Sequence, residues 1–282
     1  MNMAITNTHN EKLTQIRKLQ QRRRWRERAG RFVAEGEDLL AAADAAGWPA
    51  LERYCAAGSG LPGVEVEPGL LASVSELGSG TRVLGVYEER WALTPPGPLC
   101  VYLHGVSDPG NVGTVLRSAQ AFGASSVALG PGSADPFGPK AVRASMGAVF
   151  AVPLARAPAI TDLPGTTIAL VAGAGAPLAE LWRFMSEGLT PNAKVEASEA
   201  GASVAGGRPA ELRRFTSEGL TPNAKVEDGG VTLLIGAERE GLPEELIAGA
   251  DHVAQIPIRS HSLNAAMAAT VALYEVTRMA PV

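Results

Sequence analysis

Cysteine and long apolar runs are scarce in this sequence, and each scarcity excludes a class of protein. The 282 residues include two cysteines, Cys55 and Cys100, which lie far apart in the chain. This count excludes a disulfide framework and a cysteine-rich zinc site. No apolar run reaches the roughly 18 residues that a membrane-spanning helix needs. The first ten residues are polar and lack the basic-then-apolar order of a secretory signal, so we expect a cytoplasmic protein that does not bind membranes.

The signatures of several common enzyme classes are missing as well. The chain contains neither a GxxxxGK(S/T) phosphate loop nor the GxSxG nucleophile elbow of serine hydrolases. The segment AGAGA (172–176) does not make a convincing dinucleotide-binding fingerprint. No cluster of metal ligands is evident, so no metal is predicted.

What the chain does contain is enough apolar sequence for a sizeable core. Apolar residues make up 46% and charged residues 19%, which argues against general disorder. The 32 glycines and 20 prolines favour many tight loops over a helical bundle. A chain of this length forms one large domain or two ordinary ones.

Basic charge is concentrated near the N-terminus, although the net charge is −4. Residues 12–31 carry nine of the 25 basic side chains and one acidic side chain, Glu27. The rest of the chain therefore holds 16 basic against 28 acidic groups. Such segregation favours a local contact with a polyanion, and Trp25 could stack there on a nucleic-acid base. The alternative is a solvated helix face with Trp25 folded onto the core.

The N-terminal part is predicted to be a small α/β domain over residues 1–93. Apolar residues at helical spacing predict one basic amphipathic helix over 11–28. RFVAEG (31–36) is typical of a strand, and a helix over 37–47 is expected to stop at Gly47. Short apolar segments follow to about residue 92. TPPGP (94–98) is a linker, because its prolines continue neither a helix nor a central strand.

Residues 99–282 show a different pattern. Nearly continuous apolar strands alternate with helices, which predicts a parallel sheet covered on both faces and an α/β fold. Ligands of such sheets bind beyond the carboxyl ends of the strands. Three segments contain residues that lie just after a predicted strand end: 107–119, 233–246 and 256–274. The candidates for a site within them are 111–117, 236–238 and 262–264.

One segment interrupts this alternation. Residues 179–196 recur as 210–227, with 16 of 18 positions identical at an offset of 31 residues. Solenoid repeats need at least three units, so two copies indicate a tandem duplication. The sequence between the copies is small and polar, and we expect about 185–228 to be an exposed, flexible insertion.

In the first candidate segment, SDPGNVGTVLRSA, Asp108 to Gly110 form a turn and Asn111 is expected to cap the following helix. Arg117 follows less than two turns later. A helix N-terminus and an arginine together can bind a phosphate or a polarised oxygen. An ordinary capped helix with an exposed arginine is equally consistent with this segment alone.

The other two candidate segments carry Glu238 and Asn264. Glu238 lies in a turn after a buried strand, between two glycines that permit close approach of a ligand. The alternative is a solvated loop carboxylate. In the last segment Ser262 is expected to cap the final helix, while Asn264 is unfavourable in a first helical turn and is therefore a candidate for binding. His261 in the same loop is more typical of a surface residue.

Taken in order, these segments resemble one family. DPGNVGTVLRSAQAFGA, IGAEREGLPEE and IP followed by SLNAAMAATVALYE look like the three motifs of the SpoU-type (TrmH-like) branch of the SPOUT RNA methyltransferases. DPFGPKAVRASMGA (135–148) matches the segment between the first two. The N-terminal part resembles the ribosomal-protein-like (L30e-like) substrate-binding domain of family members that act on ribosomal RNA. The loop before Ser262 is shorter than in many relatives.

The resemblance implies transfer of a methyl group from S-adenosylmethionine to a ribose 2′-hydroxyl of RNA, a trefoil knot in residues 99–282, and a homodimer through the last helix and the helix after Asn111. The positions that match the family's motif residues are expected to be catalytic: Arg117, Asn111, Glu238, Ser262 and Asn264. The loops expected to hold the cofactor contribute four residues: Val171, Gly236, Ile256 and Leu263. The arginines expected to contact RNA are Arg22, Arg23, Arg24 and Arg143.

The substrate implied by the N-terminal resemblance is large-subunit (23S) ribosomal RNA. Transfer RNA, methylation of a base, and an RNA-binding homologue without catalysis are the alternatives. For the chemistry we favour Arg117 as a group that orients the 2′-oxygen rather than as a base, because a guanidinium loses its proton only with great difficulty. Asn111 is expected to fix the geometry of Arg117.

Overall fold

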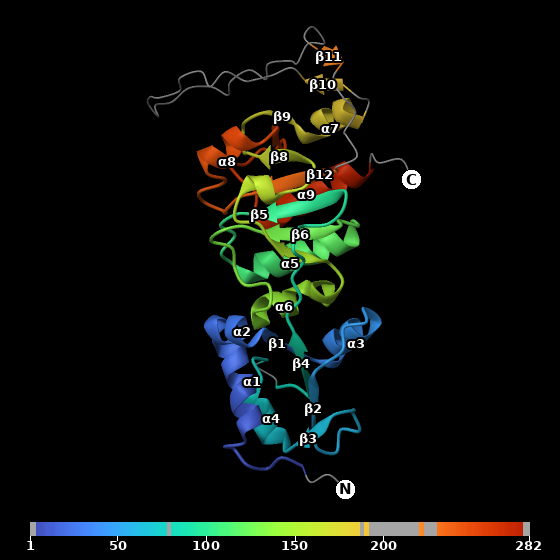
Figure 1. Cartoon of the computed structure of the whole chain (residues 1–282), viewed down its shortest axis with the longest axis vertical. Coiled ribbons are helices and arrows are strands. Elements are labelled where there is room, and N and C mark those ends of the chain that lie inside the picture. Colours follow the sequence, from blue (N-terminus) through green and yellow to red (C-terminus); the bar gives the residue numbers. More distant parts are fainter. Residues whose placement is uncertain (1–3, 78–79, 187–188, 192–219, 223–229, 279–282) are drawn as a thin grey trace.

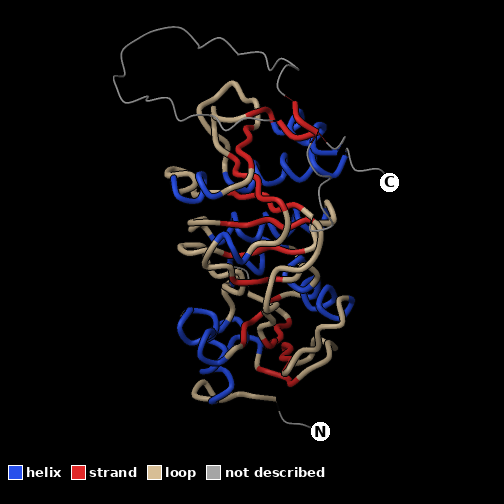
Figure 2. Tube along the Cα trace, turned by 45° about the horizontal axis from the view of Figure 1, so that its top comes forward, coloured by secondary structure: helices blue, strands red, loops and turns tan. Residues whose placement is uncertain are grey.

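Two β-sheets form the framework of the computed structural model, which describes residues 4–77, 80–186, 189–191, 220–222 and 230–278. A four-stranded sheet lies toward the N-terminal end of the molecule and a seven-stranded sheet lies beyond it (Figure 1). The helices pack against these sheets in both parts, as the trace coloured by secondary structure shows (Figure 2). Among the described helices, none has the length and apolar character to span a membrane.

The N-terminal sheet has the strand order β1-β4-β2-β3. Its strands are β1 (Arg31–Glu35), β2 (Glu52–Ala56), β3 (Val64–Val66) and β4 (Val83–Glu88). Its helices are α1 (Glu11–Gln21), α2 (Arg23–Ala29), α3 (Glu37–Ala45) and α4 (Pro68–Val74). Leu13, Ile16 and Leu19 are buried on one face of α1, in a core that includes residues of the sheet and α4. The helical spacing of apolar residues in the sequence therefore marked the buried face correctly.

The prediction of a single helix over 11–28 is wrong. The helix ends at Gln21, and a second helix begins at Arg23. Arg22 has an extended backbone, with φ −127° and ψ 107°. The buried side chain of Arg26 donates hydrogen bonds to the carbonyl oxygens of Leu19 and Gln20, at 2.6 and 3.0 Å. These bonds satisfy carbonyls that the end of α1 leaves without helical partners. The break is thus stabilised by a side chain from the next helix.

The C-terminal sheet is parallel throughout, as predicted, with the order β7-β6-β5-β12-β8-β13-β9. Its strands are β5 (Leu99–Leu103), β6 (Ser126–Leu129), β7 (Leu154–Arg156), β8 (Thr166–Leu170), β9 (Ala176–Pro177), β12 (Val231–Ile235) and β13 (His252–Gln255). Its helices are α5 (Pro109–Ala121), α6 (Pro139–Ser145), α7 (Leu178–Ser186), α8 (Glu244–Gly249) and α9 (Ala265–Arg278), with two 3₁₀ turns, Ala148–Phe150 and Ile160–Asp162.

Both faces of this sheet are covered. Val101 and Leu103 of β5 belong to one apolar cluster, with residues of α5 and α9. Cys100 and Tyr102 of the same strand belong to a second cluster on the other face, which Leu246 of α8 joins. Burial on both faces explains why these strands read as continuous apolar runs rather than as alternating ones.

The two sheets are joined by a shared aromatic core. Phe32 of β1 packs against Phe137 and Phe150, with ring centroids 4.7 and 5.7 Å apart. Arg26 of α2 forms an ion pair of 2.7 Å with Asp135, and both side chains are almost fully buried. The N-terminal part therefore packs against the C-terminal part, in addition to being joined to it by the linker.

The duplicated segment is described only in part. β10 (Leu189–Pro191) pairs antiparallel with β11 (Leu220–Pro222), and these are equivalent triplets of the two copies. Met185 of α7 is buried, although the exposed insertion was predicted to start at about residue 185. The rest of that prediction lies outside the described residues.

Candidate active site

Loops that follow β8, β12 and β13 meet at the carboxyl edge of the parallel sheet. Together with the start of α9 they line a cavity of about 440 Å³. The four residues expected to hold a cofactor all line it: Val171, Gly236, Ile256 and Leu263. Ser262 and Glu238 also line it. Segments separated by more than 80 residues in the sequence are thus brought to one place by the strand order.

The turn at Gly236 requires glycine. A Cβ atom at this position would lie 2.2 Å from the carbonyl carbon of Gly241, which leaves no room for it. Ala237 and Gly241 exchange two backbone hydrogen bonds across the turn, at 3.1 and 2.9 Å. The tight turn directs Glu238 toward the cavity.

The N-terminus of α5 is capped by Asp108, not by Asn111 as predicted. The Asp108 carboxylate accepts hydrogen bonds from the backbone N–H groups of Gly110 and Asn111, at 2.6 and 3.1 Å. Its second oxygen pairs with Lys140 at 2.8 Å, and this hydrogen bond lowers the pKa of Asp108. Pro109 can then occupy the first helical position, where its missing N–H costs nothing.

Because Asp108 serves as the cap, the side chain of Asn111 is available to the site. Its Nδ2 donates a hydrogen bond to Oε1 of Glu238. Its Oδ1 accepts a hydrogen bond of 3.1 Å from Nδ2 of Asn264. Three of the predicted catalytic residues, one from each candidate segment, therefore form a continuous hydrogen-bonded chain beside the cavity.

Asn264 has a second role, which corrects the prediction that Ser262 caps the last helix. The Oδ1 atom of Asn264 accepts from the backbone N–H groups of Ala266 and Met267, at 2.9 and 3.3 Å. Asparagine is a favoured cap because its side-chain oxygen satisfies such groups. The cap leaves Nδ2 of Asn264 directed at Asn111.

Arg117 lies apart from this chain of residues. Its side chain is exposed on α5, and within the described part of the protein it has no hydrogen bond or ion pair. Six helical residues correspond to about 9 Å of rise and about 240° of rotation, so Arg117 and Asn111 project from different sides of α5. The prediction that Asn111 fixes the geometry of Arg117 is therefore wrong.

The basic segment divides into exposed and internal arginines. Arg22, Arg23 and Arg24 are exposed. Arg143 is exposed as well, and its guanidinium donates to the carbonyl oxygen of Glu76 at 3.4 Å. Arg26 belongs to the same basic segment of the sequence, but its side chain is buried.

The structure also places Trp25 and His261. Trp25 is partly buried against the N-terminal core, and the ammonium of Lys18 lies 4.5 Å from its ring centroid, as in the alternative that folds it onto the core. His261, taken as a surface residue, is exposed but lines the cavity. The position of His261 in the loop before Ser262 was the feature of the sequence that could have predicted this.

In the described ranges, no three His, Cys, Asp or Glu side chains are grouped so that they could hold a metal ion.

Solved structures of similar overall fold cover nearly the whole chain. The chain aligns over 99% of its length with an AdoMet-bound rRNA methyltransferase from Sinorhizobium meliloti, also over 99% of that chain, at 27% identity and a TM-score of 0.74. The SpoU methyltransferase AviRb from Streptomyces viridochromogenes, in complex with AdoMet, aligns over 95% of this chain and 97% of its own at 24% identity, with a TM-score of 0.71. The similarity to AviRb shows a shared fold.

Curated relatives match a smaller part. A 23S rRNA (uridine(2479)-2′-O)-methyltransferase from Streptomyces viridochromogenes is 31% identical over 174 residues, 61% of this chain and 50% of the relative. An uncharacterized tRNA/rRNA methyltransferase from Mycobacterium bovis is 32% identical over 179 residues, 62% of this chain and 50% of the relative. The chain thus spans about half the length of these relatives.

The model of the SpoU rRNA Methylase family matches residues 98–177 and 193–274, which is more than half of the chain. The match includes all three segments that supply Asn111, Glu238 and Asn264. The chain therefore belongs to the SpoU rRNA methylase family.

Proposed function

We propose that this protein transfers a methyl group from S-adenosylmethionine to a ribose 2′-hydroxyl of 23S ribosomal RNA. The observation that carries the proposal is the hydrogen-bonded chain Asn264–Asn111–Glu238 beside the cavity at the carboxyl edge of the sheet. Membership of the family and similarity to a protein named as a 23S rRNA 2′-O-methyltransferase support the reaction and the substrate.

The cavity fits the proposed cofactor in size and in lining. Its volume of about 440 Å³ falls within the range of small-molecule sites, about 300–1,000 Å³. Val171, Ile256 and Leu263 offer apolar walls for a purine ring, and the glycine turn at Gly236 exposes backbone groups. S-adenosylmethionine, when bound, supplies a methyl group on a sulfonium with a good neutral leaving group.

The protein's own residues then have two tasks, alignment and charge stabilisation. Asn111, Glu238 and Asn264 hold one another in fixed orientations at the mouth of the cavity, which preorganises the place where the ribose enters. Arg117 provides a guanidinium that orients the 2′-oxygen and an adjacent phosphate. Ser262 lines the cavity and contributes a hydroxyl to the same edge.

Because Arg117 projects away from Asn111, we propose that it serves the site of a second subunit, in a homodimer formed through α5 and α9. Two large apolar side chains on α9, Met267 and Tyr274, are 57% and 51% exposed. They are seven residues apart and share a helix face. Tyr274 also contacts Phe122 at the end of α5, which extends this apolar surface.

Charged residues on this surface are expected to separate the subunits. The double variant Met267→Lys/Tyr274→Lys should elute as a monomer in size-exclusion chromatography with light scattering, and it should lose methyl transfer. Leu93→Lys is the matched control, because Leu93 is fully exposed and follows Ala92, which pairs with Ala155 of the edge strand β7. A double variant with the wild-type mass would contradict the proposed interface.

Residues 1–93 are proposed as an RNA substrate-binding domain of the L30e-like type, with the exposed Arg22, Arg23 and Arg24 as phosphate contacts and Arg143 as a further contact. Ribosomal RNA is preferred to transfer RNA because the family description and the 23S-specific relative both name it.

We also propose that residues 99–282 contain the family's trefoil knot. The convergence of the loops after β12 and β13 on one cavity supports it.

Methyl transfer itself is the test of the proposed function. Purified protein is incubated with radiolabelled S-adenosylmethionine and unmodified 23S ribosomal RNA or transfer RNA, and the product is digested with ribonuclease. We expect label in the 23S RNA, in a nuclease-resistant dinucleotide that marks a 2′-O-methyl ribose. Label in a mononucleotide would indicate base methylation, and no label in either RNA would indicate a homologue without catalysis.

A further inference from the structure

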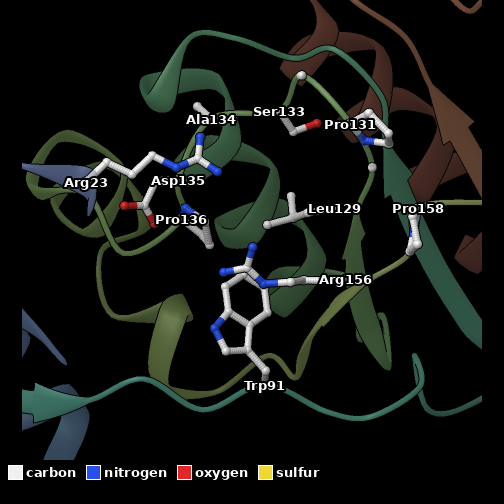
Figure 3. Close-up of a pocket in the computed structure, with 12 residues that line it drawn as sticks. Arg23, Trp91, Leu129, Pro131, Ser133, Ala134, Asp135, Pro136, Arg156 and Pro158 are labelled. Atoms are coloured by element: carbon white, nitrogen blue, oxygen red, sulfur yellow. The ribbon is translucent and has the colours of Figure 1, made fainter. Parts of the chain in front are cut away.

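A second cavity, of about 380 Å³, lies at the junction of the two sheets (Figure 3). It is lined by Arg23 of α2, by Trp91 between β4 and β5, by Arg156 at the end of β7, and by Leu129 at the end of β6 with the loop 130–136 that follows it. Arg23 enters from one side, whereas Trp91 and Arg156 enter from the other (Figure 3). The cavity thus combines two arginines with a tryptophan.

Arg156 and Trp91 form a stacked platform in this cavity. The Arg156 guanidinium carbon lies 4.2 Å from the centroid of the Trp91 ring. Trp91 is held in place by a hydrogen bond of 3.1 Å from its Nε1 to Glu89 and by an edge-on contact with Phe137. Arg156 is exposed, so a ligand can reach this side chain.

Two guanidinium groups, those of Arg23 and Arg156, line the cavity. Its lining includes one carboxylate, Asp135, whose Oδ2 accepts a hydrogen bond of 2.8 Å from Nε of Arg26 and forms an ion pair of 2.7 Å with Nη2 of the same residue. The other oxygen of Asp135 accepts the backbone N–H of Phe137 at 2.9 Å. Its charge is therefore balanced by Arg26 inside the protein. The nearby carboxylate of Glu89 accepts the Trp91 N–H, and Arg156 has no ion pair in the described part of the chain. Arg23 pairs with a partly exposed carboxylate, Glu27, at 2.9 Å.

The loop that lines the junction cavity is hydrogen-bonded to the loop that precedes Asn111. The cavity loop donates and accepts backbone hydrogen bonds with the loop that leads into α5: Gly105 N–H to Pro131 O, and Ala134 N–H to Val106 O, both 2.9 Å. Both cavities lie at the carboxyl edge of the same sheet. β6 and β12 are separated by one strand, which corresponds to about 10 Å. One RNA strand can therefore occupy both places.

We propose that this junction cavity binds one nucleotide of the RNA substrate that flanks the methylated one. Its base stacks on the outer face of the Arg156 guanidinium, extending the Trp91–Arg156 stack, and its phosphate binds Arg23. Bases of single-stranded RNA segments stack on arginine planes and aromatic rings, and arginine binds phosphate in a fixed fork geometry. The inference rests on the proposed function only in that RNA is the substrate.

The test compares two arginines that stack on tryptophan. Arg156→Ala is expected to raise the Kd for unmodified 23S ribosomal RNA about 10-fold or more, from the loss of base stacking. Arg156→Lys should be impaired nearly as much, because lysine keeps the charge but lacks the plane. Arg90→Ala is the matched control, since Arg90 stacks on Trp48 at 4.5 Å outside the cavity, and its Kd should equal that of the wild type.

Affinity for S-adenosylmethionine and the melting temperature should not change in either alanine variant. Wild-type affinity of Arg156→Ala for the RNA, equal weakening in Arg90→Ala, or no binding of the RNA by the wild type would each overturn the proposal. Failure of the proposed function has a different signature: the wild type would bind the RNA and transfer no methyl group, while the Arg156 comparison would still report on the cavity.

Discussion

Arg117→Ala is expected to lower the single-turnover rate of methyl transfer about 100- to 1,000-fold, as loss of a charge-stabilising donor does in other enzymes. Folding should be unaffected, because the Arg117 side chain is exposed and no hydrogen bond or ion pair holds it in the described part of the chain. The rate is measured with saturating S-adenosylmethionine and RNA, alongside the melting temperature. Arg82→Ala, an exposed arginine in the N-terminal part, serves as the control.

Mixing two inactive variants tests whether Arg117 acts across the subunit interface. Arg117→Ala and Glu238→Ala are denatured together, refolded and assayed. If Arg117 serves the partner's site, about a quarter of the wild-type activity returns, since half of the dimers are mixed and each holds one complete site. If Arg117 serves its own subunit's site, both sites of a mixed dimer are defective and no activity returns. An Arg117→Ala protein with most of its single-turnover rate would refute either arrangement.

Arg26→Ala is expected to reduce the free energy of unfolding by about 3–5 kcal/mol, the usual effect of removing one partner of a buried ion pair. The substitution leaves the Asp135 carboxylate buried without its cation, and it leaves the carbonyls of Leu19 and Gln20 without their donor. Urea unfolding followed by circular dichroism measures the change.

Arg28→Ala is the control for this prediction, because Arg28 lies on the same helix and is exposed. Its free energy of unfolding should stay within about 0.5 kcal/mol of the wild type. Equal stability of the Arg26 and Arg28 variants would show that the ion pair does not stabilise the contact between α2 and the loop that contains Asp135.

The fold of the C-terminal part could be predicted because its strands are buried on both faces. All five residues of β12 are buried. Apolar strands of this kind that alternate with helices are typical of a parallel sheet covered on both faces. The end of the first N-terminal helix was harder to predict. The helical spacing of apolar residues continues past Arg22, and only the contacts of Arg26 with the carbonyl groups of Leu19 and Gln20 show why the helix ends there.

The sequence alone placed Asn111, Glu238 and Asn264 in one candidate site, but it also placed Arg117 there and did not select His261. Asn111, Glu238 and Asn264 each follow a strand, and parallel strands bring their carboxyl ends to one edge. Only the tertiary structure decided what each residue does there. Asp108 and Asn264 are the caps instead of Asn111 and Ser262, and Asn111 contacts Glu238 rather than Arg117. Caps and side-chain partners depend on three-dimensional contacts between segments up to 153 residues apart, which local sequence does not record.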